Sequence, residues 1–386
     1  MKQGPLAGFK ILEFAGIGPG PMCGMLLADL GADVLRLDRA VPTGLGVQKP
    51  TRYDLLNRGK RVLAVELKHP DGVALARRLV GKADGTIEGL RPGAMERLGL
   101  GPQDCLALNP RLVYGRVTGF GQEGPLSLAA GHDLNYIAMS GALHAIGRAG
   151  APPTPPLNLV GDFGGGGLML AFGIVCALLE ASRSGKGQVV DTAMVDGAAT
   201  LMASFFGSLG AGQYNGVRGD NMLDSGAPHY EVYECADGQF ISIAPIELKF
   251  REVLFERLGL PVERATDLDD RRQWPAYKQR FAEIFKSRPS AHWCELLEGT
   301  DACFAPVLAP GAAHEHPHNK LRGTFVEVDG VLQPAAAPRF SRTPAGVPAA
   351  PVAAGPSGVA AAVDWGLAEP DLRALIERGV VVERAS

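Results

Sequence analysis

Two ionisable residues, His132 and Asp162, each stand directly before a mostly apolar stretch with a helical pattern. His132 lies in "AGHDLNYIAMSG" (130–141), and Asp162 precedes four consecutive glycines in "LNLVGDFGGGG" (157–167). The amino end of a helix offers unpaired N–H groups and a positive dipole end, which stabilise a developing oxyanion. An imidazole, a carboxylate and such donors are the groups needed to remove and return a proton beside a carbonyl. A plain helix cap also accounts for the position of Asp162.

A second candidate site is the glycine-rich stretch "AGIGPGP" (15–21), which follows an apolar run. Asp38 ends the next apolar run, about where dinucleotide-binding folds keep the acid that binds the ribose. The two prolines of the stretch oppose an NAD site, because a phosphate loop works through backbone N–H groups. Arg39 suits a phosphate or an adenine face better than a bare diol. We therefore interpret these glycines as a tight turn that lets a helix pack on a strand.

Two further patterns carry less weight. The alternating histidines of "HEHPH" (314–318) can bind a metal, but such a run is more often an exposed loop. Cys23 lies at a predicted helix start, where a thiolate is favoured. No histidine stands near it in the sequence, so we interpret Cys23 as a packing residue.

The composition limits the class of protein. The chain has 386 residues, of which 46% are hydrophobic and 20% charged, and its net charge is -3. These values are typical of a globular protein and give no overall field that attracts nucleic acid. Six scattered cysteines without a CxxC pair, and an amino end unlike a signal peptide, predict a cytoplasmic protein. The most apolar run, 164–179, is shorter than the roughly 18–20 residues of a membrane span, so we expect a buried core helix.

The elements that must position these residues alternate along the first half of the chain. Apolar runs typical of strands occupy 9–14, 32–38, 61–67, 84–90 and 111–117. Helical patterns lie between them, notably 19–31, which begins with Pro and ends with Gly, and 71–83. This alternation predicts a parallel sheet covered by helices.

The second half has a different character. A hairpin with an Asp-Gly turn is predicted over 231–246, followed by helices at 247–258, 274–287 and 290–299. These elements predict a smaller α+β unit. A Pro- and Ala-rich stretch, 334–358, is interpreted as a linker, and 369–379 as a terminal helix.

Taken in order, the motifs resemble the family III CoA-transferase superfamily and, within it, the α-methylacyl-CoA racemases. The resemblance spans about the first 345 residues. The matching segments are "FAGIGPGP" (14–21), "ADVLRLDR" (32–39), "NRGKR" (57–61), "EGLRPGAMERLGLGP" (88–102), "RLVYGRVTGFGQEGP" (111–125), "AGHDLNYIAMSG" (130–141), "PLNLVGDFGGGG" (156–167), "GKGQVVDTAMVDG" (185–197), "RGDNMLDSGAPHYEVYECADG" (218–238), "DACFAPVL" (301–308) and "PRFSRTP" (338–344).

The resemblance implies an α/β fold with a large Rossmann-like domain, residues 1–192 and 318–386, and a small α+β domain, residues 223–304. Residues 193–222 and 305–317 would be linkers. It further implies an interlocked homodimer, with each active site between the large domain of one chain and the small domain of the other.

The implied reaction interconverts (2R)- and (2S)-2-methylacyl-CoA thioesters by proton transfer through an enolate. By resemblance His132 and Asp162 are the two bases, and Glu247 in "APIELKF" (244–250) supports His132. Leu248 stands where the family motif has Pro, so the local match is weaker there. CoA is part of the substrate, and the resemblance implies no separate cofactor and no metal.

The resemblance also implies a set of residues that bind CoA. They are Arg39, Val65, Glu66, Leu67, Lys68, Gly89, Leu90, Arg91, Gly131, Asp133, Leu134, Asn135 and Tyr136. Two other functions stay open: a CoA-transferase in which Asp162 is a nucleophile that forms a mixed anhydride, and a non-catalytic acyl-CoA-binding protein. A nucleophile mechanism has no need of His132, so that residue favours racemisation.

Overall fold

The computed structural model describes residues 3–42, 44 and 46–384, and the chain divides into two compact units. The first unit comprises Met1–Ser140, Leu157–Leu201 and Arg322–Ser386, so it is built from both ends of the chain. The second comprises Gly141–Pro156 and Met202–Leu321. Each unit has its own cluster of buried apolar side chains, as expected for a domain.

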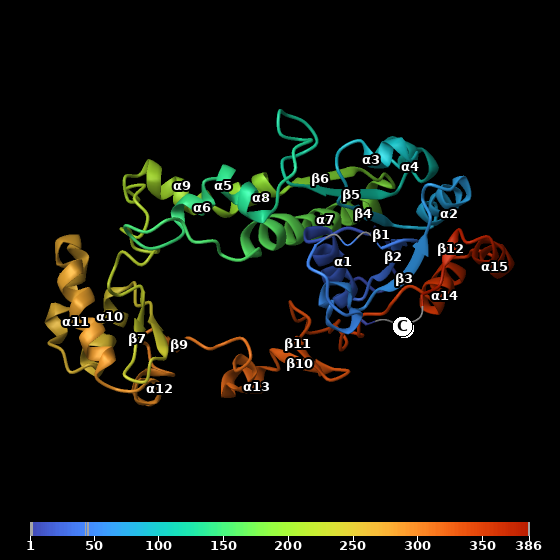
Figure 1. The fold of residues 1–386 in the computed structure, drawn as a ribbon. Coiled ribbons are helices and arrows are strands. Elements are labelled where there is room, and N and C mark those ends of the chain that lie inside the picture. Colours follow the sequence, from blue (N-terminus) through green and yellow to red (C-terminus); the bar gives the residue numbers. More distant parts are fainter. Residues whose placement is uncertain (1–2, 43, 45, 385–386) are drawn as a thin grey trace. The chain divides into compact units, whose positions relative to one another are not determined.

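The first unit is organised around a seven-stranded sheet in the order β12-β3-β2-β1-β4-β5-β6 (Figure 1). Neighbours from β3 to β6 pair in parallel, and only β12 runs antiparallel, beside β3. The strands are β1 (Lys10–Phe14), β2 (Asp33–Arg39), β3 (Arg61–Val65), β4 (Gly85–Glu88), β5 (Val113–Thr118), β6 (Val189–Ala193) and β12 (Val381–Val382). The predicted α/β class with a parallel sheet is confirmed. The strand order reverses between β1 and β4, and ligands of such sheets bind outside the carboxyl ends of the strands at this point.

Helices cover both faces of the sheet because apolar side chains point alternately to the two sides of each strand. Ile11 of β1 packs in one apolar cluster with α1 and α7, whereas Leu12 packs in another with α2, α4, α14 and α15. The helices are α1 (Pro19–Asp29), α2 (Pro70–Val80), α4 (Pro102–Leu108), α7 (Met169–Ser184), α14 (Pro356–Asp364) and α15 (Glu369–Glu377). In Figure 1 the red carboxyl-terminal segment with α14 and α15 returns to the blue amino-terminal strands.

Three elements of this unit differ from the sequence-based prediction. The last three residues of the Pro- and Ala-rich stretch, 356–358, begin a helix, α14, which starts with Pro356, a residue favoured in the first helical turn. This helix approaches β3 so closely that a Cβ atom at Gly358 would lie 2.0 Å from the Val62 carbonyl oxygen. The strands β6 and β12 were not predicted, because the pattern VVDTA of β6 is partly polar and β12 has only two residues.

The apolar run after Asp162 forms one continuous helix, Leu159–Ser184, in which a π-helical segment, η3 (Leu159–Leu168), leads into α7. By length and composition this helix could span a membrane, with a mean hydropathy of 1.8 and 44% of its most apolar window buried. One face packs on the sheet, but Phe172 is 67% exposed and Leu179 is 54% exposed. The prediction of a buried core helix is therefore wrong for the face of this helix that carries Phe172 and Leu179.

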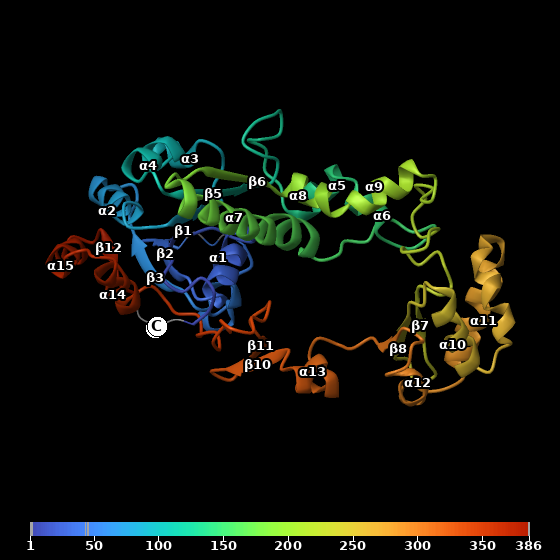
Figure 2. The same cartoon turned by 180° about the vertical axis from the view of Figure 1, so that it is seen from behind.

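The second unit contains an antiparallel sheet, β7-β8-β9, packed by helices (Figure 2). Its elements are β7 (Glu231–Glu234), β8 (Phe240–Ile243), β9 (Phe304–Pro306), α10 (Leu248–Arg257), α11 (Trp274–Lys286) and α12 (Ser290–Leu297). The predicted hairpin is confirmed, and its turn residue Gly238 has a φ of 74°, which favours glycine. The three helices predicted after it are confirmed as well.

The remaining elements connect or decorate these two sheets. In the first unit they are η1 (Thr51–Tyr53), η2 (Leu55–Asn57), α3 (Ala94–Arg97), α5 (Asp133–Met139), α8 (Met194–Leu201) and the hairpin β10 (Phe325–Val328) and β11 (Val331–Pro334). In the second they are α6 (Ala142–Ala145), α9 (Ala203–Gly210), η4 (Val262–Asp269), η5 (Arg271–Gln273) and η6 (Ala313–Glu315), and α13 (Pro317–Arg322) lies at the boundary.

Candidate active site

The two motifs that carry the predicted bases are joined by the carboxylate of Asp133. Asp133 is the first residue of α5, directly after His132, and is only 5% exposed. Its Oδ2 atom accepts hydrogen bonds of 2.7 Å from the backbone N–H groups of both Gly161 and Asp162. Hydrogen bonds to a charged acceptor are stronger than neutral ones. The structure therefore fixes the backbone of Asp162 to the residue that follows His132.

Asp162 lies over the turn that follows β1, at the reversal of strand order. A Cβ atom placed on Gly18 would lie 3.1 Å from Asp162 Oδ2, so a glycine leaves room for the carboxylate. Gly18 also has a φ of 63°, a conformation that side-chain-bearing residues rarely adopt. The Asn158 side chain donates to the same Oδ2 atom over 3.2 Å.

The surroundings of Asp162 strengthen it as a base. Burial raises the pKa of Asp162, and the hydrogen bond from Asn158 opposes this shift. The charge of Asp133 raises the pKa further, whereas His132 lowers it, and the net shift is upward. A carboxylate with a raised pKa holds a proton more readily, as a group that must both accept and donate requires.

His132 occupies the position just before α5, and its side chain is exposed. Its backbone N–H donates to Asn135 Oδ1 over 3.0 Å, which fixes the start of the helix. The Tyr136 hydroxyl donates to the carbonyl of Gly131, and its ring packs edge-to-face on Phe120 at 5.0 Å. The loop that presents His132 is thus held by side chains of the helix that it opens.

The four glycines after Asp162 serve mainly to let helices approach. Cβ atoms on Gly166 and Gly167 would lie 2.8 Å from Pro19 Cβ and 2.7 Å from Met22 Cγ, both in α1. A Cβ on Gly165 would lie 2.7 Å from the backbone nitrogen of Ala198 in α8. The sequence predicted that the N–H groups at this helix start stabilise a developing oxyanion. The structure packs the glycines against helices, and Asp133 accepts from the N–H groups of Gly161 and Asp162.

Glu247 belongs to the second unit. It is the residue before α10, its backbone is extended, and its side chain is exposed. An exposed carboxylate at this position is available to a group outside its own helix. Its predicted support of His132 stays a prediction.

A comparison with known families decides the assignment of the chain. The family described as CoA-transferase family III matches residues 6–355, which is most of the chain. The chain belongs to CoA-transferase family III. The resemblance inferred from its motifs is therefore confirmed.

Several relatives of this family III member have names or solved structures. It is 47% identical over 347 residues to a protein from Mus musculus named α-methylacyl-CoA racemase, covering 89% of this chain and 88% of the relative. A Homo sapiens protein of the same name is 44% identical, with 88% and 87% covered. A solved CaiB/BaiF family protein from Brucella suis has a TM-score of 0.77 and 24% identity, over 94% of this chain and all of that one. At that identity the likeness supports the fold alone.

In this family III member the residues predicted to bind CoA follow successive parallel strands. Arg39 ends β2, Lys68 follows β3, and Arg91 follows β4, and all three side chains are exposed. They lie along the carboxyl edge of the sheet, where ligands bind in such folds. The other residues predicted to bind CoA fall into groups according to where they lie. Val65, Leu67 and Leu90 pack in the apolar core, and Glu66 and Gly89 are their neighbours in the sequence. Gly131, Asp133, Leu134, Asn135 and Tyr136 lie at the start of α5.

The dinucleotide interpretation loses its ribose-binding acid in the structure. The carboxylate of Asp38 binds Arg384 Nη1 at 3.0 Å and lies 3.7 Å from Arg36 Nη2. The Asp38 carboxylate therefore interacts with two guanidinium groups. The glycine at position 18 accommodates Asp162, as described above, rather than a pyrophosphate. Cys23 is buried, and burial raises the pKa of its thiol, which agrees with its interpretation as a packing residue.

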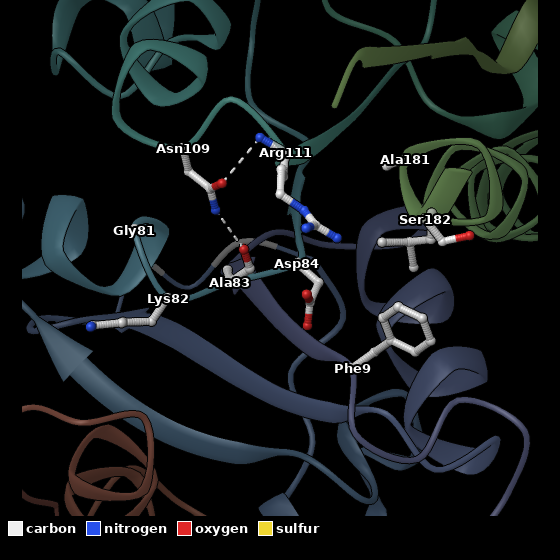
Figure 3. Close-up of a pocket in the computed structure, with 10 residues that line it drawn as sticks. Phe9, Gly81, Lys82, Ala83, Asp84, Asn109, Arg111, Ala181 and Ser182 are labelled. Atoms are coloured by element: carbon white, nitrogen blue, oxygen red, sulfur yellow. Dashed lines mark hydrogen bonds between the residues drawn. The ribbon is translucent and has the colours of Figure 1, made fainter. Parts of the chain in front are cut away.

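A hollow of about 230 Å³ lies on the opposite edge of the same sheet (Figure 3). Phe9, Asp84 and Arg111 line it, and they precede β1, β4 and β5 respectively. Figure 3 shows Asn109 bridging the Ala83 carbonyl and the Arg111 backbone across it. The hollow is at the amino ends of the strands, so it is separate from the candidate active site at their carboxyl ends.

Sequence reasoning missed two residues that contact the Asp162 carboxylate. Asn158 stands four residues before Asp162, and this spacing places two residues on one face of a helix. The spacing alone did not indicate that Asn158 contacts the Asp162 carboxylate. Gly18 had been assigned to a turn, and only the folded chain brings that turn to Asp162.

Proposed function

We propose that this family III member is an isomerase that interconverts the two enantiomers at C2 of 2-methylacyl-CoA thioesters. One observation carries the proposal: Asp133 ties the backbone of Asp162 to the residue after His132, so that an imidazole and a carboxylate belong to one site. The names of the mouse and human relatives support the same reaction. The raised pKa of Asp162 suits proton transfer.

The chemistry needs two bases because the α-proton must leave from one face and return to the other. The α-proton of a thioester is weakly acidic, so a base must be held close to it while the enolate forms. His132 is neutral when it accepts and cationic when it donates, and Asp162 alternates between carboxylate and acid. An interaction with Glu247 would orient the imidazole and stabilise its cation.

The transferase alternative predicts a different outcome with the same protein. A racemase exchanges the α-hydrogen of a 2-methylacyl-CoA with deuterium from D2O when no acceptor acid is present. A transferase requires the acceptor and forms an acyl adduct on Asp162. Mass spectrometry of substrate and protein distinguishes the two, and a protein that only binds acyl-CoA gives neither product.

We also propose that the active enzyme is a homodimer in which Glu247 of one protomer serves the site of the other. An apolar stripe supports association: Leu168, Phe172, Val175 and Leu179 are 37–67% exposed along one side of the helix Leu159–Ser184. Their spacing of four, three and four residues places them on one face. A contiguous exposed apolar surface of this kind marks an association site.

Charge placed in this stripe should separate the protomers. We expect Phe172→Glu to shift the protein from dimer to monomer, because a carboxylate would have to be buried at the interface. Sedimentation velocity measures the change. Leu108→Glu is the control, since Leu108 is an exposed apolar residue of α4, on the other face of the sheet. A dimer that persists unchanged in Phe172→Glu would remove the stripe from the interface.

Replacement of Arg39 or Lys68 should weaken CoA binding but leave the rate of the chemical step nearly unchanged. For Arg39→Ala and Lys68→Ala we expect KM for acyl-CoA to rise about threefold to tenfold while kcat changes little, because these side chains act far from the proton transfer. The effect should shrink at high salt, where the wild-type attraction is screened as well. Steady-state kinetics at two ionic strengths tests this. An unchanged KM in both variants would place the nucleotide elsewhere.

A further inference from the structure

A fully buried ion pair lies beneath the turn that contacts Asp162. Glu13 of β1 and Lys60, the residue before β3, meet with 2.6 Å between Glu13 Oε2 and Lys60 Nζ. Both side chains are 0% exposed. Arg36 of β2 lies 3.9 Å from the other oxygen of Glu13. None of these residues takes part in the proton transfer described above.

The ammonium group of Lys60 contacts three segments. Besides its ion pair with Glu13, it donates to the Pro21 carbonyl over 3.0 Å and to Asn57 Oδ1 over 3.2 Å. Pro21 lies in the first turn of α1. The buried cation therefore links β1, the segment before β3, and the start of α1.

The helix α1 lies directly on this pair. A Cβ atom on Gly24 would lie 1.8 Å from Glu13 Oε2 and 2.9 Å from Lys60 Nζ, so any larger residue there would displace the ion pair. The contact leaves little freedom for α1 to slide along the sheet, because interiors are close-packed.

The start of α1 in turn contacts the segment that carries Asp162. Gly18, the residue before α1, borders the Asp162 carboxylate, and Pro19 packs against Gly166 of η3. A displacement of the first turn of α1 is therefore transmitted to the position of the carboxylate. Reaction rates depend steeply on such positions, since a 1 Å misplacement can cost about 10²-fold.

We infer that Glu13 and Lys60 are positioning residues, which fix the first turn of α1 and through it the place of the Asp162 carboxylate. The inference rests on the proposed function. A well-packed apolar pair of similar volume is often as stable as a buried ion pair, so stability does not distinguish this one. Its distinct contribution is the hydrogen bond from Lys60 to the Pro21 carbonyl, which an apolar side chain cannot make.

The test compares two neighbouring residues of the same chain. Lys60→Met removes the link to α1, whereas Arg61→Met, the control, removes a cation that pairs with Asp33 and Asp364 at the amino end of β3. The double variant Glu13→Gln/Lys60→Met leaves no unpaired buried charge and serves if the single variant fails to fold. Each protein is given the separate enantiomers of a 2-methylacyl-CoA in D2O, and α-deuterium incorporation is measured by mass spectrometry.

We expect a selective loss. The enantiomer that depends on Asp162 is identified as the one whose exchange Asp162→Asn abolishes. In Lys60→Met and in the double variant its exchange should fall about 10- to 10²-fold, while exchange of the other enantiomer stays within about threefold of wild type. Arg61→Met should change both enantiomers equally and by little. Equal losses for the two enantiomers, or no loss in the double variant, would overturn the positioning role.

A second measurement separates this inference from the proposed function. Amide hydrogen exchange of the intact protein reports whether the first turn of α1 and the segment 158–163 lose protection. We expect a loss in Lys60→Met and in the double variant but not in Arg61→Met. Absence of α-exchange in the unmodified protein would refute the racemase function, whereas unchanged amide protection in the double variant would refute the positioning role whatever the reaction.

Discussion

Racemisation should collapse in both His132→Ala and Asp162→Asn, while each variant still exchanges the α-hydrogen of one enantiomer. Inversion needs a base on each face of the enolate, but exchange needs only one. The base that remains can remove a proton and return a deuteron on its own face. Racemisation should fall on the order of 10²–10⁴-fold or more, the usual scale for a positioned acid–base group. Asp162→Asn keeps the shape and the backbone N–H groups held by Asp133.

The measurement is α-deuterium incorporation into each enantiomer separately. The two variants should have opposite preferences. If both lose exchange of the same enantiomer, or if either racemises at nearly the wild-type rate, the assignment of two bases is wrong. Circular dichroism and thermal melting serve as folding controls. His132 is exposed, so its replacement should leave folding intact.

The second large effect should come from Asp133, a residue to which the family resemblance gives a role in CoA binding. Asp133→Ala removes the acceptor of two backbone N–H groups, and one of these, on Gly161, is buried. A buried donor without a partner costs about 1–3 kcal/mol, so we expect lower stability and a loss of kcat of about 10- to 10²-fold. Chemical denaturation and steady-state kinetics measure the two effects.

Asp133→Asn tests the electrostatic part of the same contact. The charge of Asp133 raises the pKa of Asp162, so its removal should lower that pKa. Asp162 then keeps its base form to lower pH. The acid limb of exchange for the Asp162-dependent enantiomer should accordingly move to lower pH than in the wild type. A limb that moves to higher pH, or stays in place, would contradict the contact between the two carboxylates.

The periodicity of the sequence predicted most of the parallel sheet because five of its strands are apolar runs separated by helical patterns. It did not predict η3, because a π-helical turn leaves no periodic signature in so glycine-rich a stretch. Nor did it predict α14, because its alanines and its single proline follow a Pro- and Ala-rich stretch and are equally typical of a linker.

The sequence predicted the ionisable residues of the candidate site but not the contacts between them. His132 and Asp162 stood out because each precedes an apolar stretch with a helical pattern, and the family resemblance gave them roles. The carboxylate of Asp133 looked like one more polar group beside His132, since only folding brings residues 28 and 29 positions apart into contact. Lys60 and Glu13 also gave no signal, because a charged residue in a sequence is normally a surface residue.

The pairing of β12 with β3 has a consequence for the order in which the protein is made. Val381 and Val382 complete the edge of a sheet whose other strands lie before residue 194, and α14 and α15 cover part of one face of that sheet. The amino-terminal strands therefore leave the ribosome long before α14 and α15 are synthesised. The apolar surface that Trp365 and Leu372 later bury stays open to chaperones, or to other nascent chains, for most of translation. The second unit, by contrast, lies mostly in one continuous stretch, Met202–Leu321. It can therefore fold before synthesis ends.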